Sequence, residues 1–164
     1  MRIAREILSY ILIVIIIVIF RTYIMTPAQV NRSSMEPTLI DREIVLLNKI
    51  KYRITDIERF DIVVVKVANY GSLVKRVIGL PGEKVEYIHG HLYINNQPIA
   101  EPFLTNNIED LILTETIPDN KYFVLGDNRN NSIDSRTFGL VDRKDIVGSI
   151  DWALYPFNRF GKVK

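Results

Sequence analysis

The 164-residue chain has no cysteine and only two histidines, His89 and His91. The lack of cysteine excludes disulfides, thiol catalysis, iron–sulfur clusters and zinc sites built from thiolates. Two histidines are too few for most histidine-based metal centres, so we expect neither a metal ion nor another cofactor. The chain also lacks a marked excess of charge, because 21 Lys and Arg residues accompany 19 Asp and Glu residues.

The body of the chain is electrically neutral. Residues 1–25 contain three arginines and one glutamate, so the remaining 139 residues carry 18 basic and 18 acidic groups. A neutral body has no electrostatic footprint for nucleic acid, which argues against that class of partner. Hydrophobic residues make up 48% of the chain, too many for a disordered protein. We therefore expect a small folded enzyme or binding domain.

An apolar run occupies residues 7–20. Eleven of residues 7–19 are Ile, Leu or Val, which leaves no polar face for a soluble amphipathic helix. When the run is extended to Met25 as a helix, it measures about 28 Å, close to the ~30 Å hydrocarbon core of a bilayer. The sequence therefore predicts a membrane-spanning anchor.

The charges around this run predict its orientation. Arg2 and Arg5 precede it, and positive charge is retained on the cytoplasmic side. We expect residues 1–25 to form a cytoplasmic tail and single-pass anchor in the cell membrane, with residues 26–164 on the extracytoplasmic side. A cleavable signal peptide is the alternative, but residues 21–26 contain no small-x-small cleavage site.

The rest of the chain reads as a mostly β domain. Its β-branched runs lack regular βα alternation, which favours an antiparallel architecture. A short helix is expected over residues 107–113, and residues 97–120 form the least strand-like stretch, a small insertion or flexible loop. Seven segments are predicted as strands: Ile44–Leu47, Ile62–Val67, Leu73–Ile78, Lys84–Ile88, His91–Ile94, Tyr122–Leu125 and Ile146–Ala153.

Ser34 lies in a short segment that follows the anchor. Pro37 disfavours helical backbone at Glu36, so Ser34 is expected in a constrained loop. A serine in such a loop is either a turn hydroxyl or a nucleophile, and a nucleophile needs a base to accept its proton.

Two kinds of base are available to this serine. His89 and His91 flank a glycine in a predicted hairpin, a spacing that suits a turn at least as well as catalysis. Strand alternation places Lys75 on the same face as Leu73 and Val77. Lowering a lysine pKa from about 10.4 to ~7.5 needs roughly 4 kcal/mol of desolvation, which burial supplies in other proteins. Lys75 is therefore either a base made by burial or an ordinary surface lysine.

Residues 126–136 form a dense polar loop after the predicted strand that ends at Leu125. Side chains of these types hydrogen-bond readily to nearby backbone, so the loop is either a hydrogen-bonded buttress or a solvated hairpin loop. Asp134 and Arg136 are two residues apart, which allows them to face the same way and pair.

Taken in order, these segments resemble bacterial type I signal peptidase (leader peptidase), a family of membrane-anchored serine proteases with a Ser-Lys dyad. The similarity runs from the anchor to about Pro156. It implies a mostly β fold, with one N-terminal transmembrane helix followed by an antiparallel β catalytic domain of the signal-peptidase/LexA-like type.

The resemblance also implies roles for individual residues. The family's serine motif is matched by residues 34–39, which makes Ser34 the implied nucleophile. Its lysine motif is matched by residues 75–82, which makes Lys75 the implied general base.

Two further family motifs are present. The strand between the dyad residues is similar to residues 59–65, and the closing motif is matched within residues 126–139. In that closing motif, the resemblance implies that Ser132 orients the lysine while Asp134 and Arg136 form a structural pair.

The substrate implied by the resemblance is an exported pre-protein whose signal peptide has small residues at the first and third positions before the cut. The implied partners are therefore signal peptides and the lipid bilayer. Five apolar positions match the family's substrate pockets: Val30, Met35, Leu39, Leu73 and Val74.

The sequence departs from the family pattern at three positions. Arg32 stands where the family usually has Gly or Ser, and a serine there helps form the oxyanion hole. The backbone N–H of Ser34 must then stabilise the oxyanion, with help from Ser33. Phe60 stands where the family usually has Gly, and Asn130 where it has Asp.

Four aromatic residues near the C-terminus allow two interpretations. They either rest the domain on the lipid interface or cap the β core. These residues are Trp152, Tyr155, Phe157 and Phe160.

Three rival functions stay open at this point. A membrane-anchored adaptor would hold peptides in the same groove without cutting them. A self-cleaving protein of the LexA type would share the Ser-Lys β fold, but that class needs a DNA-binding domain where this chain has an apolar anchor. A histidine-based relative would use His89 or His91 as its base.

Overall fold

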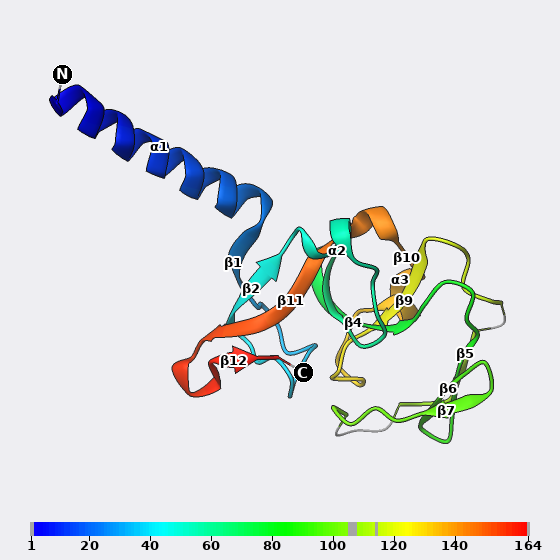
Figure 1. Cartoon of the computed structure of the whole chain (residues 1–164). Helices are drawn as coiled ribbons and strands as arrows, with labels where there is room; N and C mark the ends of the chain where they lie inside the picture. The colour runs from blue at the N-terminus through cyan, green and yellow to red at the C-terminus, as the bar shows by residue number, and fades with distance from the viewer. Residues whose placement is uncertain (1, 105–107, 114, 164) are drawn as a thin grey trace.

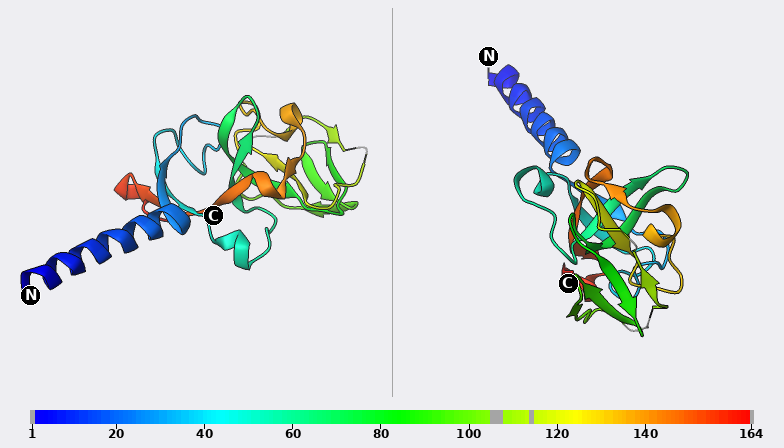
Figure 2. Two further views of the ribbon diagram at one scale, coloured as in Figure 1. Left: turned by 90° about the horizontal axis from the view of Figure 1, so that it is seen from above. Right: turned by 90° about the vertical axis from the view of Figure 1, so that its right-hand side faces the viewer.

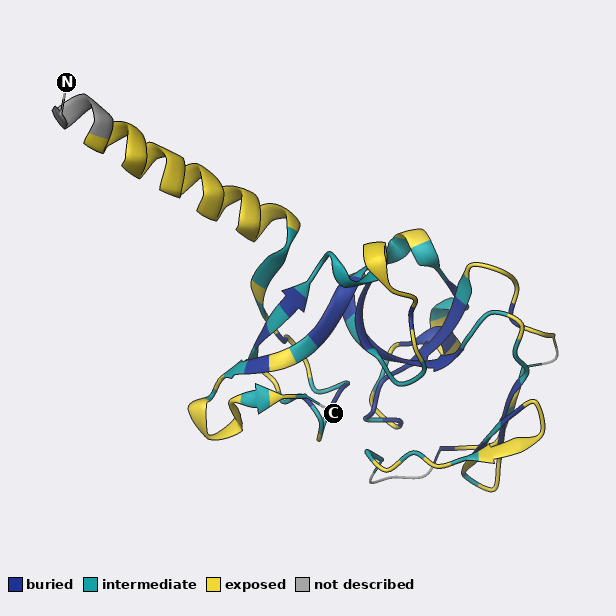
Figure 3. Cartoon of the chain, in the orientation of Figure 1, coloured by how far each residue is buried: buried dark blue, intermediate teal, exposed yellow. Residues whose placement is uncertain are grey.

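The computed structural model describes residues 2–104, 108–113 and 115–163, and side chains from residue 6 onward (Figure 1). It begins with the helix α1 (Arg2–Tyr23), whose described side chains, from Glu6 to Tyr23, are all exposed, as the yellow ribbon in Figure 3 shows. Within the described residues, one helix is long and apolar enough to cross a membrane, over Glu6–Tyr23 with a mean hydropathy of 2.1. The predicted span to Met25 is two residues too long, because Met25 begins the first strand.

Most of the remaining chain folds into a large antiparallel sheet. Its strands are ordered β1-β2-β11-β3-β4-β9-β10, and β12 pairs with β11. Their bounds are β1 Met25–Gln29, β2 Ile44–Asn48, β3 Ile62–Val67, β4 Gly71–Gly79, β9 Lys121–Leu125, β10 Val141–Asp142, β11 Ile146–Tyr155 and β12 Gly161–Lys162.

A second, four-stranded sheet lies at the side of the domain remote from α1 (Figure 1). Its order is β7-β6-β5-β8, with bounds β5 Val85–Ile88, β6 His91–Ile94, β7 Gln97–Ile99 and β8 Leu111–Ile112. The β5–β6 hairpin turns on His89 and Gly90, both at positive φ (51° and 80°), the backbone that a two-residue turn with the strands' own twist requires.

Short helical turns connect the strands. The α-helical turns are α2 (Lys51–Ile54) and α3 (Ser135–Phe138), and the 3₁₀ turns are η1 (Arg143–Asp145) and η2 (Phe157–Arg159).

The expected mostly β fold and all seven predicted strands are confirmed, with bounds shifted by a few residues. The helix predicted over residues 107–113 is wrong in its described part. Leu111 pairs with Tyr87, and Leu113 N–H donates to Val85 O, so this short segment extends the second sheet. Seven residues are too few for a helix that packing does not support. Residue 107 lies outside the described residues, and the stretch predicted as an insertion, 97–120, carries β7 and β8.

Three groups of buried apolar side chains hold the domain together. One joins the second sheet to β9, and another packs Met35 and Leu39 against β2, β3 and β11. The third, on β3, β4 and β9, includes Leu73 and Val77. The loop that carries Ser34 is thus fixed to the same sheet whose β4 strand carries Lys75.

Candidate active site

Ser34 and Lys75 meet although 41 residues separate them in the sequence. The Nζ atom of Lys75 donates a hydrogen bond of 2.7 Å to the Oγ atom of Ser34. Lys75 is fixed within β4, where it lies opposite Val63 of β3. Ser34 lies in the turn that follows β1, in a loop whose Met35 is fully buried. The structure therefore places a hydroxyl and an amine in direct contact.

The Lys75 side chain is buried away from solvent. Only 1% of the residue is exposed, and this burial lowers its pKa from 10.5 to about 8. The negative charges of Asp134 and Asp127 oppose the shift, while the positive charges of Arg136 and Arg32 add to it. Within the part of the chain that the structure describes, no carboxylate hydrogen-bonds to Nζ. Burial is therefore the dominant cause, and a fraction of the amine is neutral near neutral pH.

The polar loop of residues 126–136 holds the backbone of the serine turn. Asn128 donates its backbone N–H to Ser34 O at 3.1 Å and its side-chain amide to Ser33 O at 3.2 Å. The side-chain amide of Asn131 donates to Ser33 Oγ at 3.1 Å. Among the described residues, the backbone N–H of Ser34 has no hydrogen-bond acceptor, so it is free to donate to a ligand.

Gly126 is needed for the close approach of these two loops. A Cβ atom at this position would overlap both the carbonyl oxygen of Ser34 and the hydroxyl of Ser132. The absence of a side chain lets the strand end of β9 pass between them. The glycine therefore sets the distance between the serine turn and the polar loop.

The polar loop also contains the predicted Asp134–Arg136 pair. Asp134 is fully buried and accepts two hydrogen bonds of 2.8 Å from the Arg136 guanidinium, as well as one from Gly126 N–H at 3.1 Å. Burial raises the pKa of Asp134, but these donors outweigh it and the net pKa is lowered. Ser132 Oγ is buried and makes no hydrogen bond among the described residues, although its hydroxyl is close enough to Asp134 to favour the charged carboxylate.

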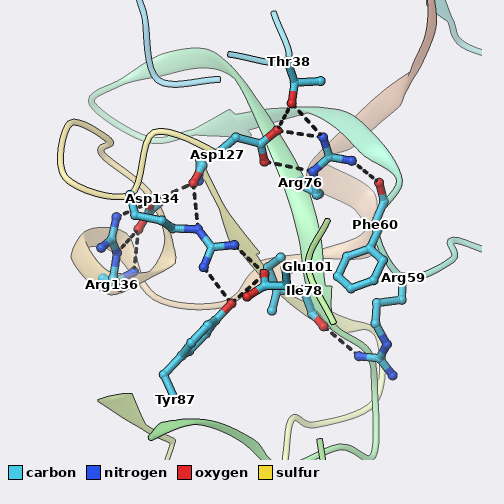
Figure 4. A network of polar contacts seen from close by, with 12 residues as sticks. Thr38, Arg59, Phe60, Arg76, Ile78, Tyr87, Glu101, Asp127, Asp134 and Arg136 are labelled. Carbon is cyan, nitrogen blue, oxygen red and sulfur yellow. Dashed lines mark hydrogen bonds and ion pairs between the residues drawn. The ribbon is translucent and has the colours of Figure 1, made fainter. Parts of the chain in front are cut away.

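A buried ion pair next to Lys75 joins β4, the polar loop and the serine loop (Figure 4). Arg76 binds both carboxylate oxygens of Asp127, at 2.8 and 2.7 Å, and donates to Phe60 O at 3.0 Å. The hydroxyl of Thr38 donates to Asp127 at 2.5 Å. The pair therefore fixes three segments around the Ser34–Lys75 contact.

A second buried network joins the polar loop to the second sheet (Figure 4). Arg129 donates to the hydroxyl of Tyr87 at 2.8 Å, to Glu101 at 2.5 Å and to Gly126 O at 3.1 Å. The hydroxyl of Tyr87 donates to the same Glu101 oxygen at 2.9 Å. Sequence analysis missed Glu101 and Tyr87, because their only signal is an acid and a tyrosine far from the motif that they contact.

Ser34 and Lys75 open into a cleft of about 1060 Å³. Four of the five predicted pocket residues line it, namely Val30, Met35, Leu73 and Val74, and Ser132 lies at the same cleft. The structure does not bring Leu39 to the cleft, because this side chain is fully buried in the core against β2, β3 and β11. The lining combines these apolar side chains with the buried amine of Lys75, the hydroxyl of Ser34 and several other polar residues.

Comparison with known proteins identifies the family of the chain. The family profile described as signal peptidase, peptidase S26, matches residues 3–155. The chain belongs to this family. It is 41% identical over 167 residues to signal peptidase I of Bacillus amyloliquefaciens, covering 95% of this chain and 90% of the relative. It is 38% identical over 178 residues to signal peptidase IB of Staphylococcus aureus, covering 95% and 93% of the two chains.

A solved structure supports the same conclusion. The crystal structure of a signal peptidase I from Enterococcus faecalis superposes with a TM-score of 0.54 at 38% identity, covering 58% of this chain and 97% of that chain. The resemblance to bacterial type I signal peptidase is thereby confirmed, and the chain is a peptidase of a membrane-associated family.

Two departures from the signal peptidase pattern coincide with unusual backbone. Arg32 has φ of 97° and Phe60 has φ of 71°, both in the region of backbone conformation that favours glycine. The Arg32 N–H donates to Asp41 at 2.7 Å, which holds the turn despite its side chain. Asn130, the third departure, is exposed at the cleft.

The two histidines do not line the cleft that contains Ser34 and Lys75. His89 and His91 are both exposed in the β5–β6 hairpin of the second sheet, and neither lines the cleft. The structure therefore gives Ser34 a lysine as its neighbour instead of a histidine.

Proposed function

We propose that the chain is a signal peptidase I that cuts signal peptides from exported pre-proteins with Ser34 as nucleophile and Lys75 as general base. The observation that carries the proposal is the 2.7 Å contact between Lys75 Nζ and Ser34 Oγ, with the amine 1% exposed. Membership in the family supplies the substrate class, and the contact supplies the chemistry.

The first half of the reaction forms an acyl-enzyme. Ser34 Oγ attacks the carbonyl carbon of the scissile bond while the neutral amine of Lys75 takes the hydroxyl proton. The resulting ammonium then protonates the leaving amine, the carbon–nitrogen bond breaks, and the new N-terminus of the mature protein departs.

The second half of the reaction hydrolyses the acyl-enzyme. Water attacks the ester, and Lys75 takes a proton from the water. The Lys75 ammonium then returns a proton to Ser34 Oγ as the signal peptide leaves.

The oxyanion is stabilised by backbone in this mechanism. The N–H of Ser34 has no acceptor among the described residues and lies next to the attacking oxygen, so it can donate to the tetrahedral intermediate. Asn128 and Asn131 hold this turn from outside, which keeps the donor oriented before substrate arrives. Arg32 supplies no hydroxyl, so the backbone donor carries this role.

Ser132, Asp134 and Arg136 position the lysine in the proposal. Ser132 Oγ is buried, makes no hydrogen bond within the described residues, and lines the same cleft as Lys75. In the proposal, this hydroxyl accepts a hydrogen bond from the Lys75 ammonium and orients it. The Asp134–Arg136 pair fixes the loop from which Ser132 projects.

Small side chains before the cut suit the cleft. Val30, Met35, Leu73 and Val74 form apolar walls around the dyad. A pocket bounded by such walls discriminates by steric exclusion, since a larger side chain would clash. The proposal therefore includes small residues at the first and third positions before the scissile bond.

The anchor confines enzyme and substrate to one bilayer. With Arg2 and Arg5 in the cytoplasm and α1 spanning the membrane, the cleft lies on the extracytoplasmic side, where translocated pre-proteins emerge. Confinement raises the effective concentration of a substrate whose signal segment is itself in the membrane. Four exposed aromatic residues in β11, in η2 and directly after η2 are available to rest on the same lipid surface: Trp152, Tyr155, Phe157 and Phe160.

The test is cleavage in trans by the full chain in phospholipid vesicles. A reporter pre-protein with Ala at both small positions should be cut by the wild type, and Ser34→Ala and Lys75→Ala should each abolish the product while thermal unfolding shows an intact fold. Lys84→Ala, at a half-exposed lysine directly before β5 of the second sheet, serves as the matched control and should keep the activity.

Other outcomes would favour the rival functions. Binding of the reporter without cleavage by the wild type would support the peptide-holding adaptor. Cutting of the chain's own backbone alone would support a self-cleaving protein. Loss of more than about tenfold in rate on replacing His89 and His91 together would overturn the lysine as base.

A further inference from the structure

A basic cavity of about 350 Å³ lies where the anchor meets the β domain. Thr22 and Tyr23, the last two residues of α1, form part of its wall. No acidic residue is among those that line it in the described part of the chain. Five basic residues do line it: Lys49, Arg53, Lys66, Arg143 and Lys144.

The fold gathers these residues from four separate elements. Asn48, at the end of β2, pairs with Met25 next to α1 and with Ser149 of β11 on its other side. Ile146 of β11 pairs with Val65 of β3. The basic residues follow β2 or lie in α2, β3 and η1, all at this end of the sheet. In the right-hand view of Figure 2, α1 meets the domain at this end.

Two of the five cations are held in place by hydrogen bonds to backbone carbonyl oxygens. Lys49 donates to Thr22 O at 3.0 Å, which ties the cavity to the anchor. Arg143 donates to Tyr52 O at 3.1 Å, and its nearest carboxylate, Asp56, is 3.9 Å away with a side chain that is 98% exposed. Neutral oxygens therefore orient these two side chains.

The other three cations are unpaired in the described structure. Arg53, Lys66 and Lys144 are exposed and have no side-chain hydrogen bond or ion pair with described residues. Several unpaired cations around one hollow favour an anion with many acceptor oxygens, and phosphate is the group that Arg and Lys bind best in this way. The hollow therefore has the charge and the donors of a phosphate site.

We propose that this basic cavity binds the phosphate-bearing headgroup of an anionic phospholipid in the bilayer that α1 spans. The assignment rests on α1 as a membrane anchor and is independent of the peptidase chemistry. Because the apolar span ends at Tyr23, the cavity lies at the depth of the headgroups, while the exposed apolar side chains of α1 offer a surface for the acyl chains.

The site would fix the height and tilt of the catalytic domain over the membrane. Its ligand contacts both α1 and the large sheet, through Thr22 and Tyr23 on one side and through α2, β3 and η1 on the other. A lipid bound there would bridge anchor and domain.

The test is lipid binding to the full chain in a non-ionic detergent, measured by native mass spectrometry. Dioleoyl phosphatidylglycerol should bind more tightly than dioleoyl phosphatidylcholine. The triple variant Arg53→Gln, Lys66→Gln, Lys144→Gln should weaken phosphatidylglycerol binding at least tenfold, because each charge near a membrane surface contributes roughly fivefold.

A matched control carries the same change of charge elsewhere. The variant Arg42→Gln, Lys84→Gln, Lys162→Gln also replaces one arginine and two lysines, none of which lines the cavity. It should bind phosphatidylglycerol like the wild type. The charge reversal Lys66→Glu provides a second variant if thermal unfolding shows that the triple variant is not folded.

Three results would overturn the assignment. Equal losses in the two triple variants would indicate a general effect of net charge, and equal binding of the two lipids would remove the role of the anion. Inorganic phosphate or glycerol 1-phosphate bound as tightly as the lipid would indicate a soluble anion instead. Each readout is a binding constant, so these experiments test the lipid site independently of the cleavage of a pre-protein.

Discussion

Breaking the buried Arg76–Asp127 pair on one side should cost more than replacing both partners. The two side chains are 2% and 0% exposed and are joined by hydrogen bonds of 2.8 and 2.7 Å. Leaving one such charge unpaired costs about 3–5 kcal/mol, out of a typical total stability of about 5–15 kcal/mol. We therefore expect Arg76→Met to lower the free energy of unfolding by several kcal/mol.

The double variant Arg76→Met, Asp127→Leu should recover part of this loss. An apolar pair of similar volume removes the uncompensated charge, and such replacements are often close to neutral. Recovery stays incomplete because Phe60 O loses its donor and Thr38 loses its acceptor, at about 1–3 kcal/mol for each group left unsatisfied.

Urea unfolding of the full chain in non-ionic micelles measures both effects. Trp152 is the only tryptophan and lies in β11 of the large sheet, so its fluorescence reports the unfolding of that sheet. Lys121→Met, which breaks the exposed Lys121–Asp142 pair, is the matched control and should change the stability little. The reasoning is refuted if Arg76→Met costs less than about 1 kcal/mol, or if the double variant is as unstable as the single one.

Three further substitutions test the immediate surroundings of the dyad. Gly126→Ala should lower kcat by roughly a hundredfold while the protein stays folded, because the new Cβ forces the Ser34 and Ser132 loops apart; an unchanged kcat would contradict this. Lys75→Met should abolish cleavage yet raise the free energy of unfolding at pH 7 by as much as about 3 kcal/mol. A base whose pKa falls to about 8 on folding costs stability at pH 7, and the cost disappears as the pH rises through 10.5, so equal stability at pH 7 would count against burial as the cause. Arg32→Gly should move the lower limb of the pH–rate profile upward, since its positive charge lowers the Lys75 pKa, whereas Arg32→Lys should leave the limb in place.

Sequence patterns predicted the parts of the fold that carry strong local signals. Composition indicates the apolar helix α1, and runs of β-branched residues indicate strands such as β3. The missed strands are short and lie mostly at sheet edges. In β1 and β7, Pro27 and Pro98 weaken the strand signal, and edge strands are where proline is tolerated.

The site residues that belong to motifs could be predicted from the sequence. The interactions between residues that are distant in the sequence could not. Alternation along β4 placed Lys75 on the face of Leu73 and Val77, and the structure buries all three. Nothing in the local sequence pairs Arg76 with Asp127, 51 residues away. Such pairing is decided by how the sheet and loops pack, which a single sequence does not display.

The position of Leu39 has the same explanation. Leu39 is the last residue of the serine motif and is apolar like the cleft residues, yet it lies in the core. The turn after Ser34 sets which apolar side chains face the cleft and which face the sheet. Residue type alone does not distinguish the two environments.

The most direct test of the account is the pH dependence of kcat/KM for the wild type with a reporter pre-protein. A Lys75 pKa of about 8 leaves the amine about 9% neutral at pH 7 and about 91% neutral at pH 9. The account predicts a rise of about tenfold between these values, with a limb near pH 8 that persists when His89 and His91 are replaced. A limb near 6.5 that vanishes with the histidines, or one near 10 that reports an ordinary solvated lysine, would contradict it.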